Sequence, residues 1–228
     1  MSKQDDAAGE MLIREVEEDL RRDYYARLWS RYGNWIIATA ILVVAIVAGY
    51  EGWQAWKSGK SAEDATKFAA ADTLMQENKV DEAVAALGKI FAESQTGYAT
   101  LAGLEQAGLL LREKKTDEAL KIYEKLAADS GTPETYRDLA KLTLAMLYLD
   151  TADVGKVEET LRPLTSPASQ WRASALELTA AALLKKGEKD RAVDLYQQIS
   201  GDPAFSRETR MRAAGMLAAV GVEPKLDK

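Results

Sequence analysis

The clearest pattern in the chain is an apolar run near its N-terminus. Residues 36–50 carry no formal charge, and the nineteen residues 35–53 carry only Glu51. At a rise of about 1.5 Å per residue, a helix of this length spans roughly 28 Å, close to the bilayer's hydrocarbon thickness of about 30 Å. The pattern therefore predicts a single transmembrane helix over residues 35–56.

Aromatic residues bracket this run on both sides, as expected for a helix whose two ends lie at membrane interfaces. The predicted interface residues are Trp29, Tyr32, Trp35, Tyr50, Trp53 and Trp56. A buried core helix has no reason to carry two aromatic belts. A cleaved signal peptide is disfavoured because the 34-residue leader is net negative and no clean Ala-x-Ala site follows the run. We interpret the run as an uncleaved signal anchor.

Basic residues are more numerous before the run than after it. Five arginines lie in the twenty or so residues before it, and three lysines lie in the twenty after Trp53. This bias predicts a cytoplasmic N-terminus and places the rest of the chain in the periplasm of a bacterium, anchored in the inner membrane. In the leader, residues 1–34, apolar residues recur every fourth position from Leu12 to Leu28. This spacing predicts an amphipathic cytoplasmic helix at the membrane surface, with a partner-binding helix as the alternative.

Beyond a linker at residues 57–63, residues 64–228 contain a repeated pattern of small and large positions. Four segments align at offsets of 36, 38 and 35 residues. Their small or branched positions are Ala83, Ala119, Val157 and Ala192, followed by Leu87, Tyr123, Leu161 and Tyr196 and then by Ile90, Leu126, Leu164 and Ile199. Twelve residues upstream lies a second register, with Ala71, Ala107, Ala145 and Ala180, then Leu74, Leu110, Tyr148 and Leu183. A fifth copy of this register has Met211, Gly215 and Ala218.

Two sets of small and large positions that recur at the same spacing are typical of stacked helix pairs. A small side chain lets two helices pack closely, and the large residue one turn away fills the hole beside it. One such pair cannot bury its apolar face alone, so neighbouring pairs must stack into a solenoid. We therefore predict an all-α fold in which the transmembrane helix precedes a solenoid of about four helix pairs plus a capping helix. All the repeated positions are assigned to packing.

The composition limits the kinds of catalytic and metal-binding site that the chain can form. The chain has a formal charge of -6 and contains no cysteine and no histidine. These absences exclude imidazole- and thiol-based catalysis, zinc sites built from these ligands, and disulfides. The acidic balance argues against a nucleic-acid partner, and no glycine-rich phosphate loop occurs. We expect no cofactor and no enzymatic activity.

The repeat period and the small positions resemble tetratricopeptide repeats. Residues 13–23, residues 29–32 ahead of an apolar span ending in Trp53, and the helical segments 98–111, 136–149 and 171–184 are similar to the YfgM-like family. Members of that family are ancillary subunits of the bacterial Sec translocon. The resemblance implies a single-pass inner-membrane protein whose periplasmic repeats contact translocon subunits, periplasmic chaperones or exported polypeptides.

In such solenoids the first helix of each pair lines the concave face. Positions one residue after the small site, and one turn to either side, should then project into a groove. The predicted groove residues are Leu104, Gly108, Leu111, Leu142, Met146, Leu149, Glu177, Ala181, Leu184, Arg212 and Met216. This groove could receive an apolar peptide or a partner helix. Alternatively, tight curvature buries these leucines, and both interpretations remain open.

The pattern as a whole predicts a non-enzymatic, membrane-tethered module for protein interaction, with its oligomeric state open. One alternative is an organiser that binds cell-wall or division proteins through the same repeats. Another is a carboxylate-based glycan-cleaving enzyme, for which Asp81 with Glu82 and Asp117 with Glu118 are the recurring pairs. Their recurrence beside turns instead favours a role as helix N-terminal charges.

Overall fold

The computed structural model describes residues 3–150 and 154–223. Contacts divide the chain into two compact units, residues 1–59 and residues 60–228. Every regular element within the described residues is helical. The predicted all-α fold is therefore confirmed.

The first unit is formed by helix α1 (Lys3–Gln76), whose last residues, from Lys60 on, belong to the second unit. Residues 57–63, predicted as a linker, are helical within α1. Among the described helices, α1 is the one that is long and apolar enough to cross a membrane, with a mean hydropathy of 1.9 in its most apolar window. Only 6% of that window is buried, whereas the core helix of a soluble protein would be mostly buried. Helix α1 is thus a candidate membrane anchor.

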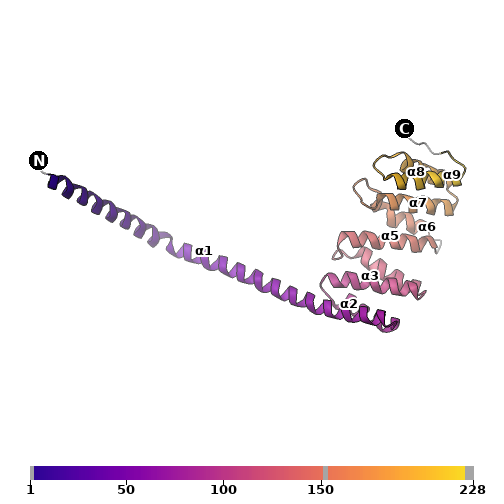
Figure 1. The fold of residues 1–228 in the computed structure, drawn as a ribbon, viewed down its shortest axis with the longest axis horizontal. Coiled ribbons are helices and arrows are strands. Elements are labelled where there is room, and N and C mark those ends of the chain that lie inside the picture. The colour runs from indigo at the N-terminus through magenta and orange to yellow at the C-terminus, as the bar shows by residue number, and fades with distance from the viewer. Residues whose placement is uncertain (1–2, 151–153, 224–228) are drawn as a thin grey trace. The chain divides into compact units, whose positions relative to one another are not determined.

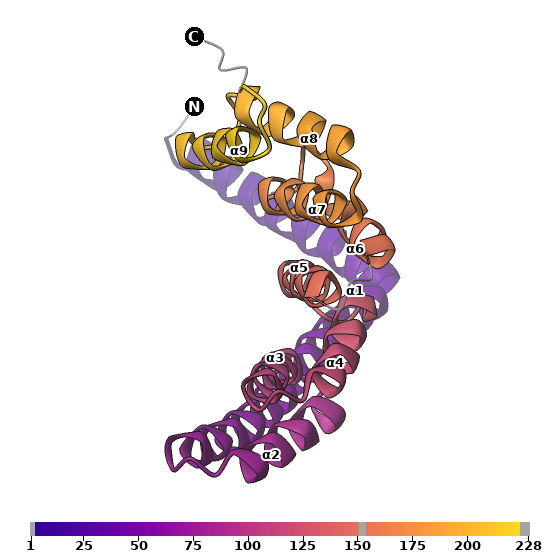
Figure 2. The same ribbon diagram turned by 90° about the vertical axis from the view of Figure 1, so that its right-hand side faces the viewer.

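The second unit is a stack of antiparallel helix pairs. After the end of α1 it contains α2 (Val80–Glu93), α3 (Gly97–Arg112), α4 (Thr116–Ala128), α5 (Glu134–Asp150), α6 (Val154–Leu161), the 3-10 helix η1 (Arg162–Thr165), α7 (Arg172–Lys186), α8 (Lys189–Gly201) and α9 (Arg207–Ala219). Each helix packs against the next in chain order (Figure 1). Figure 2 shows α3, α5, α7 and α9 along the inner side of an arc and α2, α4, α6 and α8 along its outer side. Four pairs plus a last helix are therefore present, as predicted.

The predicted packing positions of the four pairs are buried, except for Leu74, which is half-buried. Every small or branched residue of both registers has 0% exposure: Ala71, Ala83, Ala107, Ala119, Ala145, Val157, Ala180 and Ala192. The large partners form three apolar clusters, each shared by neighbouring helices. Full burial of one such leucine or isoleucine side chain contributes about 1.5–3 kcal/mol. This repeated burial, rather than surface charge, stabilises the stack.

The turns within three of the pairs share one geometry. Asn78, Lys114 and Gly187 adopt left-handed backbone conformations, with φ of 60°, 60° and 86°. After each of them, the next backbone N–H bonds back to the first helix, from Lys79 to Leu74, Lys115 to Leu110 and Glu188 to Leu183, at 2.9, 2.8 and 2.9 Å. This is the Schellman termination, which favours glycine or asparagine at the left-handed residue. It ends the first helix and starts the second within about three residues.

The third pair differs from the other pairs in its second helix, which is short. Helix α6 ends at Leu161, and Pro163 lies at the start of η1. Proline lacks a backbone N–H and clashes with the preceding turn, so an α-helix cannot continue through it. Leu164 is nevertheless buried and occupies the place that Leu126 fills in the preceding pair. The packing register therefore survives the change of helix type.

Ion pairs link successive repeats at the surface. Lys115 Nζ lies 3.1 Å from Asp81 Oδ1, and Arg191 Nη2 lies 2.7 Å from Glu158 Oε1. Exposed pairs of this kind contribute little to stability, because water and salt screen their charges. They therefore contribute less to the stability of the stack than its apolar clusters do.

Asp202 connects the two ends of the fourth pair. Its carboxylate accepts hydrogen bonds from the Ala204 backbone N–H at 2.9 Å and from Arg172 Nη1 at 3.0 Å. The pKa of Asp202 is lowered from its ordinary value of 3.8, first by the Ala204 N–H and then by Arg172. The Arg172 guanidinium also lies 4.8 Å from the centroid of the Phe205 ring. Arg172 thus links the start of α7 to the loop that follows α8, through a hydrogen bond to Asp202 and a cation–π contact with Phe205.

Candidate functional site

The exposed large apolar side chains of the second unit all lie on inner helices. Among the described residues from Lys60 on, they are Leu101 on α3, Tyr136, Leu139 and Met146 on α5, and Met211 and Met216 on α9. The outer helices α2, α4, α6 and α8 expose no such side chain in the described part of the chain. Apolar surface left in water commonly marks a site of interaction. The inner side of the arc is therefore the candidate site.

The predicted groove leucines form the partly covered floor of this side. Leu104, Leu111 and Leu149 are half-buried against the central apolar cluster, and Leu184 is half-buried against the next one. Leu142 is 4% exposed and belongs to the core, whereas Met146, one turn further along α5, is 46% exposed. The face is thus closed at Leu142 and open at Met146.

Of the two small residues predicted for the groove, Gly108 leaves space above this floor. Gly108 and Ala181 are half-buried on α3 and α7. A Cβ atom at Gly108 would meet no heavy atom within 4 Å.

Sequence reasoning missed Leu101, Tyr136 and Leu139. Leu101 and Leu139 precede the buried Ala107 and Ala145 by the same six residues, so they occupy one position in successive repeats. The signal was present in the sequence. It was missed because the predicted face was extended by only one turn to either side of the small site.

Glu177 and Arg212, both predicted as groove residues, contact each other. Arg212 Nη2 donates to both carboxylate oxygens of Glu177, at 3.1 and 3.2 Å, and so joins α7 to α9. The hydrogen bond to Glu177 is the main cause that raises the pKa of Arg212, and Glu208 adds a smaller effect. Burial raises the pKa of Tyr196, and the charge of Glu177 raises it further. The groove position Glu177 on α7 is therefore charged and paired with a cation from α9, whereas the predicted groove positions of α3 and α5 are apolar or glycine.

The predicted packing register of α9 is wrong by one residue. After α9, Gly221 has φ 79°, and the Val222 N–H donates to Leu217 O at 2.9 Å. This turn has the same geometry as the turn at Gly187, and it lies 34 residues later in the chain. The predicted offset was 35 residues. Leu217, the counterpart of Leu183, accordingly has 0% exposure, and Ala214, the counterpart of Ala180, is half-buried. The positions assigned to packing, Met211, Gly215 and Ala218, are exposed.

This correction also changes the predicted groove at α9. One residue corresponds to about 100° of helix rotation, so Arg212 and Met216 are turned away from the equivalent groove positions. Met211, which is 61% exposed, replaces them as the groove residue of this helix.

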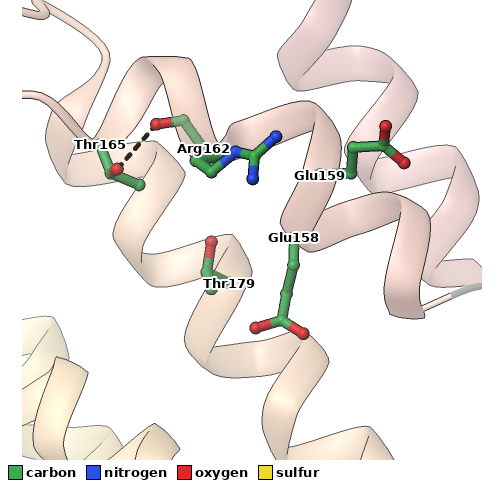
Figure 3. A pocket seen from close by; sticks show the side chains of 5 residues that line it. All are labelled: Glu158, Glu159, Arg162, Thr165 and Thr179. Carbon is green, nitrogen blue, oxygen red and sulfur yellow. Dashed lines mark hydrogen bonds between the residues drawn. The ribbon is translucent and has the colours of Figure 1, made fainter.

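A separate open cleft of about 580 Å³ lies beside α6, η1 and α7. Its lining residues are Glu158, Glu159, Arg162, Thr165 and Thr179 (Figure 3). The hydroxyls of Thr165 and Thr179 donate to backbone carbonyls at 2.9 and 2.7 Å, and Glu158 is paired with Arg191. Most of its polar groups are thus already engaged within the fold.

The carboxylates considered for glycan cleavage lie at helix starts. Asp81 and Glu82 are in the first turn of α2, and Asp117 and Glu118 are in the first turn of α4. Acidic side chains at these places interact favourably with the helix dipole. The described residues also contain no cluster of three or more carboxylates that could hold a metal ion.

The aromatic residues predicted for the membrane interface are all exposed on α1. They are Trp29, Tyr32, Trp35, Tyr50, Trp53 and Trp56. A cation lies over one ring of each belt, with Arg31 5.9 Å from the Tyr32 centroid and Lys57 5.5 Å from the Trp53 centroid. An aromatic ring paired with a basic side chain suits the interface between hydrocarbon and headgroups.

Comparison with known proteins identifies one family. The tetratricopeptide repeat-like domain matches residues 26–208, which include the apolar part of α1 and all four helix pairs. No curated protein and no solved structure matches the chain.

Proposed function

The chain belongs to the tetratricopeptide repeat-like domain family, and on that premise we propose that it is a membrane-tethered module that binds other proteins through the inner side of its repeats. Domains of this family generally act as modules for protein interaction. The observation that carries the proposal is the distribution of exposed large apolar side chains in the second unit. Those described all lie on inner helices. Burying them against a partner supplies the driving force for association.

Helix α1 is the proposed tether. In this proposal residues 1–34 form a cytoplasmic leader, residues 35–56 cross the bacterial inner membrane, residues 57–63 form a linker and residues 64–228 form the periplasmic repeat domain. The proposal is supported by the low burial of the apolar window and by the two exposed aromatic belts. The excess of arginines before the span supports the orientation.

The proposed partners are proteins of the export pathway. Residues 13–23 and the segments 98–111, 136–149 and 171–184 resemble the YfgM-like family, and that resemblance supports contact with translocon subunits, periplasmic chaperones or exported polypeptides. The apolar inner side supports the same idea, because a polypeptide that has not yet folded exposes apolar segments.

Site-specific photo-cross-linking in cells tests the partner. A photoreactive residue replaces Leu139 on the inner side of the full chain, and a matched variant carries it at the exposed Lys121 on α4. We expect the residue at 139 to capture translocon subunits, chaperones or exported chains, and the residue at 121 to capture few. Capture of wall-synthesis or division proteins at 139 would instead support the organiser. Equal capture at both positions would contradict binding through the inner side.

Protease treatment of intact spheroplasts tests the orientation. We expect externally added protease to degrade residues 64–228 while an epitope at the N-terminus stays protected. Protection of the repeats would refute the proposed topology without bearing on which side of the arc binds.

A further inference from the structure

We propose that the partner segment that docks on α3 and α5 is an amphipathic α-helix with a basic residue beside its apolar face. This inference rests on the proposed function and specifies the partner of the same surface. Its contact residues are Leu101, Glu105, Tyr136, Leu139 and Met146, named below as the α3–α5 patch.

The size of the α3–α5 patch fits a helix. Tyr136 and Met146 are ten residues apart on α5, a length of about 15 Å along the helix axis. Helices α3 and α5 share one apolar cluster and neighbour each other on the inner side (Figure 2). The apolar residues at positions i, i+3, i+4 and i+7 of a helix span about 10 Å. One such face therefore matches the stretch from Leu139 to Met146, which is seven residues and about 10 Å long on α5.

The patch offers few hydrogen-bonding groups to an extended peptide. The backbone of α3 and α5 is engaged within the helices, and the Thr143 hydroxyl donates to Leu139 O at 3.0 Å. The one side-chain amide on these two helices, Gln106, donates to Val84 O at 3.2 Å. An extended chain pressed on this surface would leave its own backbone N–H and C=O groups unpaired, which is costly. A helix satisfies those groups internally, so the surface selects for it.

The charge on the patch favours a basic residue in the partner. Glu105 is exposed one turn after Leu101 and forms no ion pair or hydrogen bond with any described residue. The other charged residue of α3 is Arg112, which lies at the last turn of the helix, two turns beyond Glu105. A lysine or arginine beside the partner's apolar face would therefore meet an unpaired carboxylate, whereas an acidic residue there would be repelled.

Fluorescence anisotropy on the full chain in nanodiscs tests the inference. The probes are three dye-labelled 18-residue peptides: a helix with leucines at i, i+3, i+4 and i+7 flanked by lysines, the same peptide with a central proline, and the same peptide with glutamates for lysines. Binding to empty nanodiscs is subtracted. The variants are Leu139→Lys, Met146→Lys and Glu105→Gln, and the control is Ala85→Lys, which places the same charge at an exposed position of the outer helix α2. Unchanged helicity by circular dichroism verifies that each variant folds.

We expect Leu139→Lys and Met146→Lys to weaken binding of the lysine-flanked helix at least tenfold, and Ala85→Lys to change it less than twofold. The proline peptide should bind at least tenfold more weakly than the lysine-flanked helix, and the glutamate peptide severalfold more weakly. Glu105→Gln should abolish the preference for lysine over glutamate. Equal binding of the proline peptide would overturn the helix while leaving the proposed function intact. A loss in Ala85→Lys as large as in Met146→Lys would overturn the location. If no peptide binds, the inference fails, and capture at position 139 in cells then decides whether the proposed function fails with it.

Discussion

Gly103 and Gly108 both lie inside α3, but only Gly108 has room for a side chain. A Cβ atom at Gly103 would lie 2.8 and 2.9 Å from two ring carbons of Phe91, whereas one at Gly108 would meet nothing within 4 Å. The Phe91 ring cannot move away freely, because it packs against the apolar clusters and Lys125 Nζ lies 4.4 Å from its centroid. The same substitution, glycine to alanine, should therefore have opposite effects at two places on one helix.

The expected magnitudes follow from helix propensity and packing. Alanine is favoured over glycine in a helix interior by about 0.8–1.0 kcal/mol, so Gly108→Ala should stabilise the protein by about that amount. Gly103→Ala gains the same term but overpacks the contact with Phe91, which costs about 1–3 kcal/mol. The two variants should therefore differ by about 1–3 kcal/mol. At about 2–4 °C per kcal/mol for a domain of this size, their melting temperatures should differ by roughly 2–12 °C.

Thermal unfolding of the full chain in nanodiscs, followed by circular dichroism, measures this difference. Urea titration at constant temperature provides an independent value from the shift in midpoint at unchanged slope. Equal stabilisation by both substitutions would show that α2 and α3 are not closely packed at Gly103. Destabilisation by Gly108→Ala would show that the inner side is closed at that position, contrary to the open space described for it.

Three further predictions concern the packing register of α7, the carboxylate of Asp202 and the ion pair between Glu177 and Arg212. Ala180→Leu should destabilise the repeats by about 1–3 kcal/mol in urea unfolding, whereas Ala181→Leu, one residue on, should cost far less; equal costs would place the packing face elsewhere. The lowered pKa of Asp202 means that its contribution is present above pH 3.8 and is lost as the pH falls below it. Asp202→Asn should thus lower the urea midpoint at pH 7, with a gap to the wild type that narrows below about pH 4; a gap independent of pH would contradict this. A double-mutant cycle on Glu177→Gln and Arg212→Gln should give a coupling below about 1 kcal/mol that decreases with salt, because the arginine is largely exposed. A larger, salt-insensitive coupling would indicate a desolvated pair.

Much of the fold could be predicted because repeat packing is local and periodic. The buried Ala71, Ala107, Ala145 and Ala180 recur at nearly constant spacing, and so does the set that begins with Ala83, so both helices of every pair are visible in the sequence. The prediction failed at α9, where Met211 and Gly215 match the expected spacing of large and small residues but lie one residue away from the true packing register. There the left-handed turn at Gly221, not the identity of the side chains, sets the register.

What the sequence by itself determined is which residues face a neighbouring helix within a repeat, because that depends on side-chain size at fixed helical intervals. What only the tertiary structure decided is the character of the inner side. The burial of Leu142, the exposure of Leu139 and Met146, and the contact between Glu177 and Arg212 depend on the angle between successive repeats. That angle is the summed result of many contacts at each junction, so no local pattern of residues encodes it.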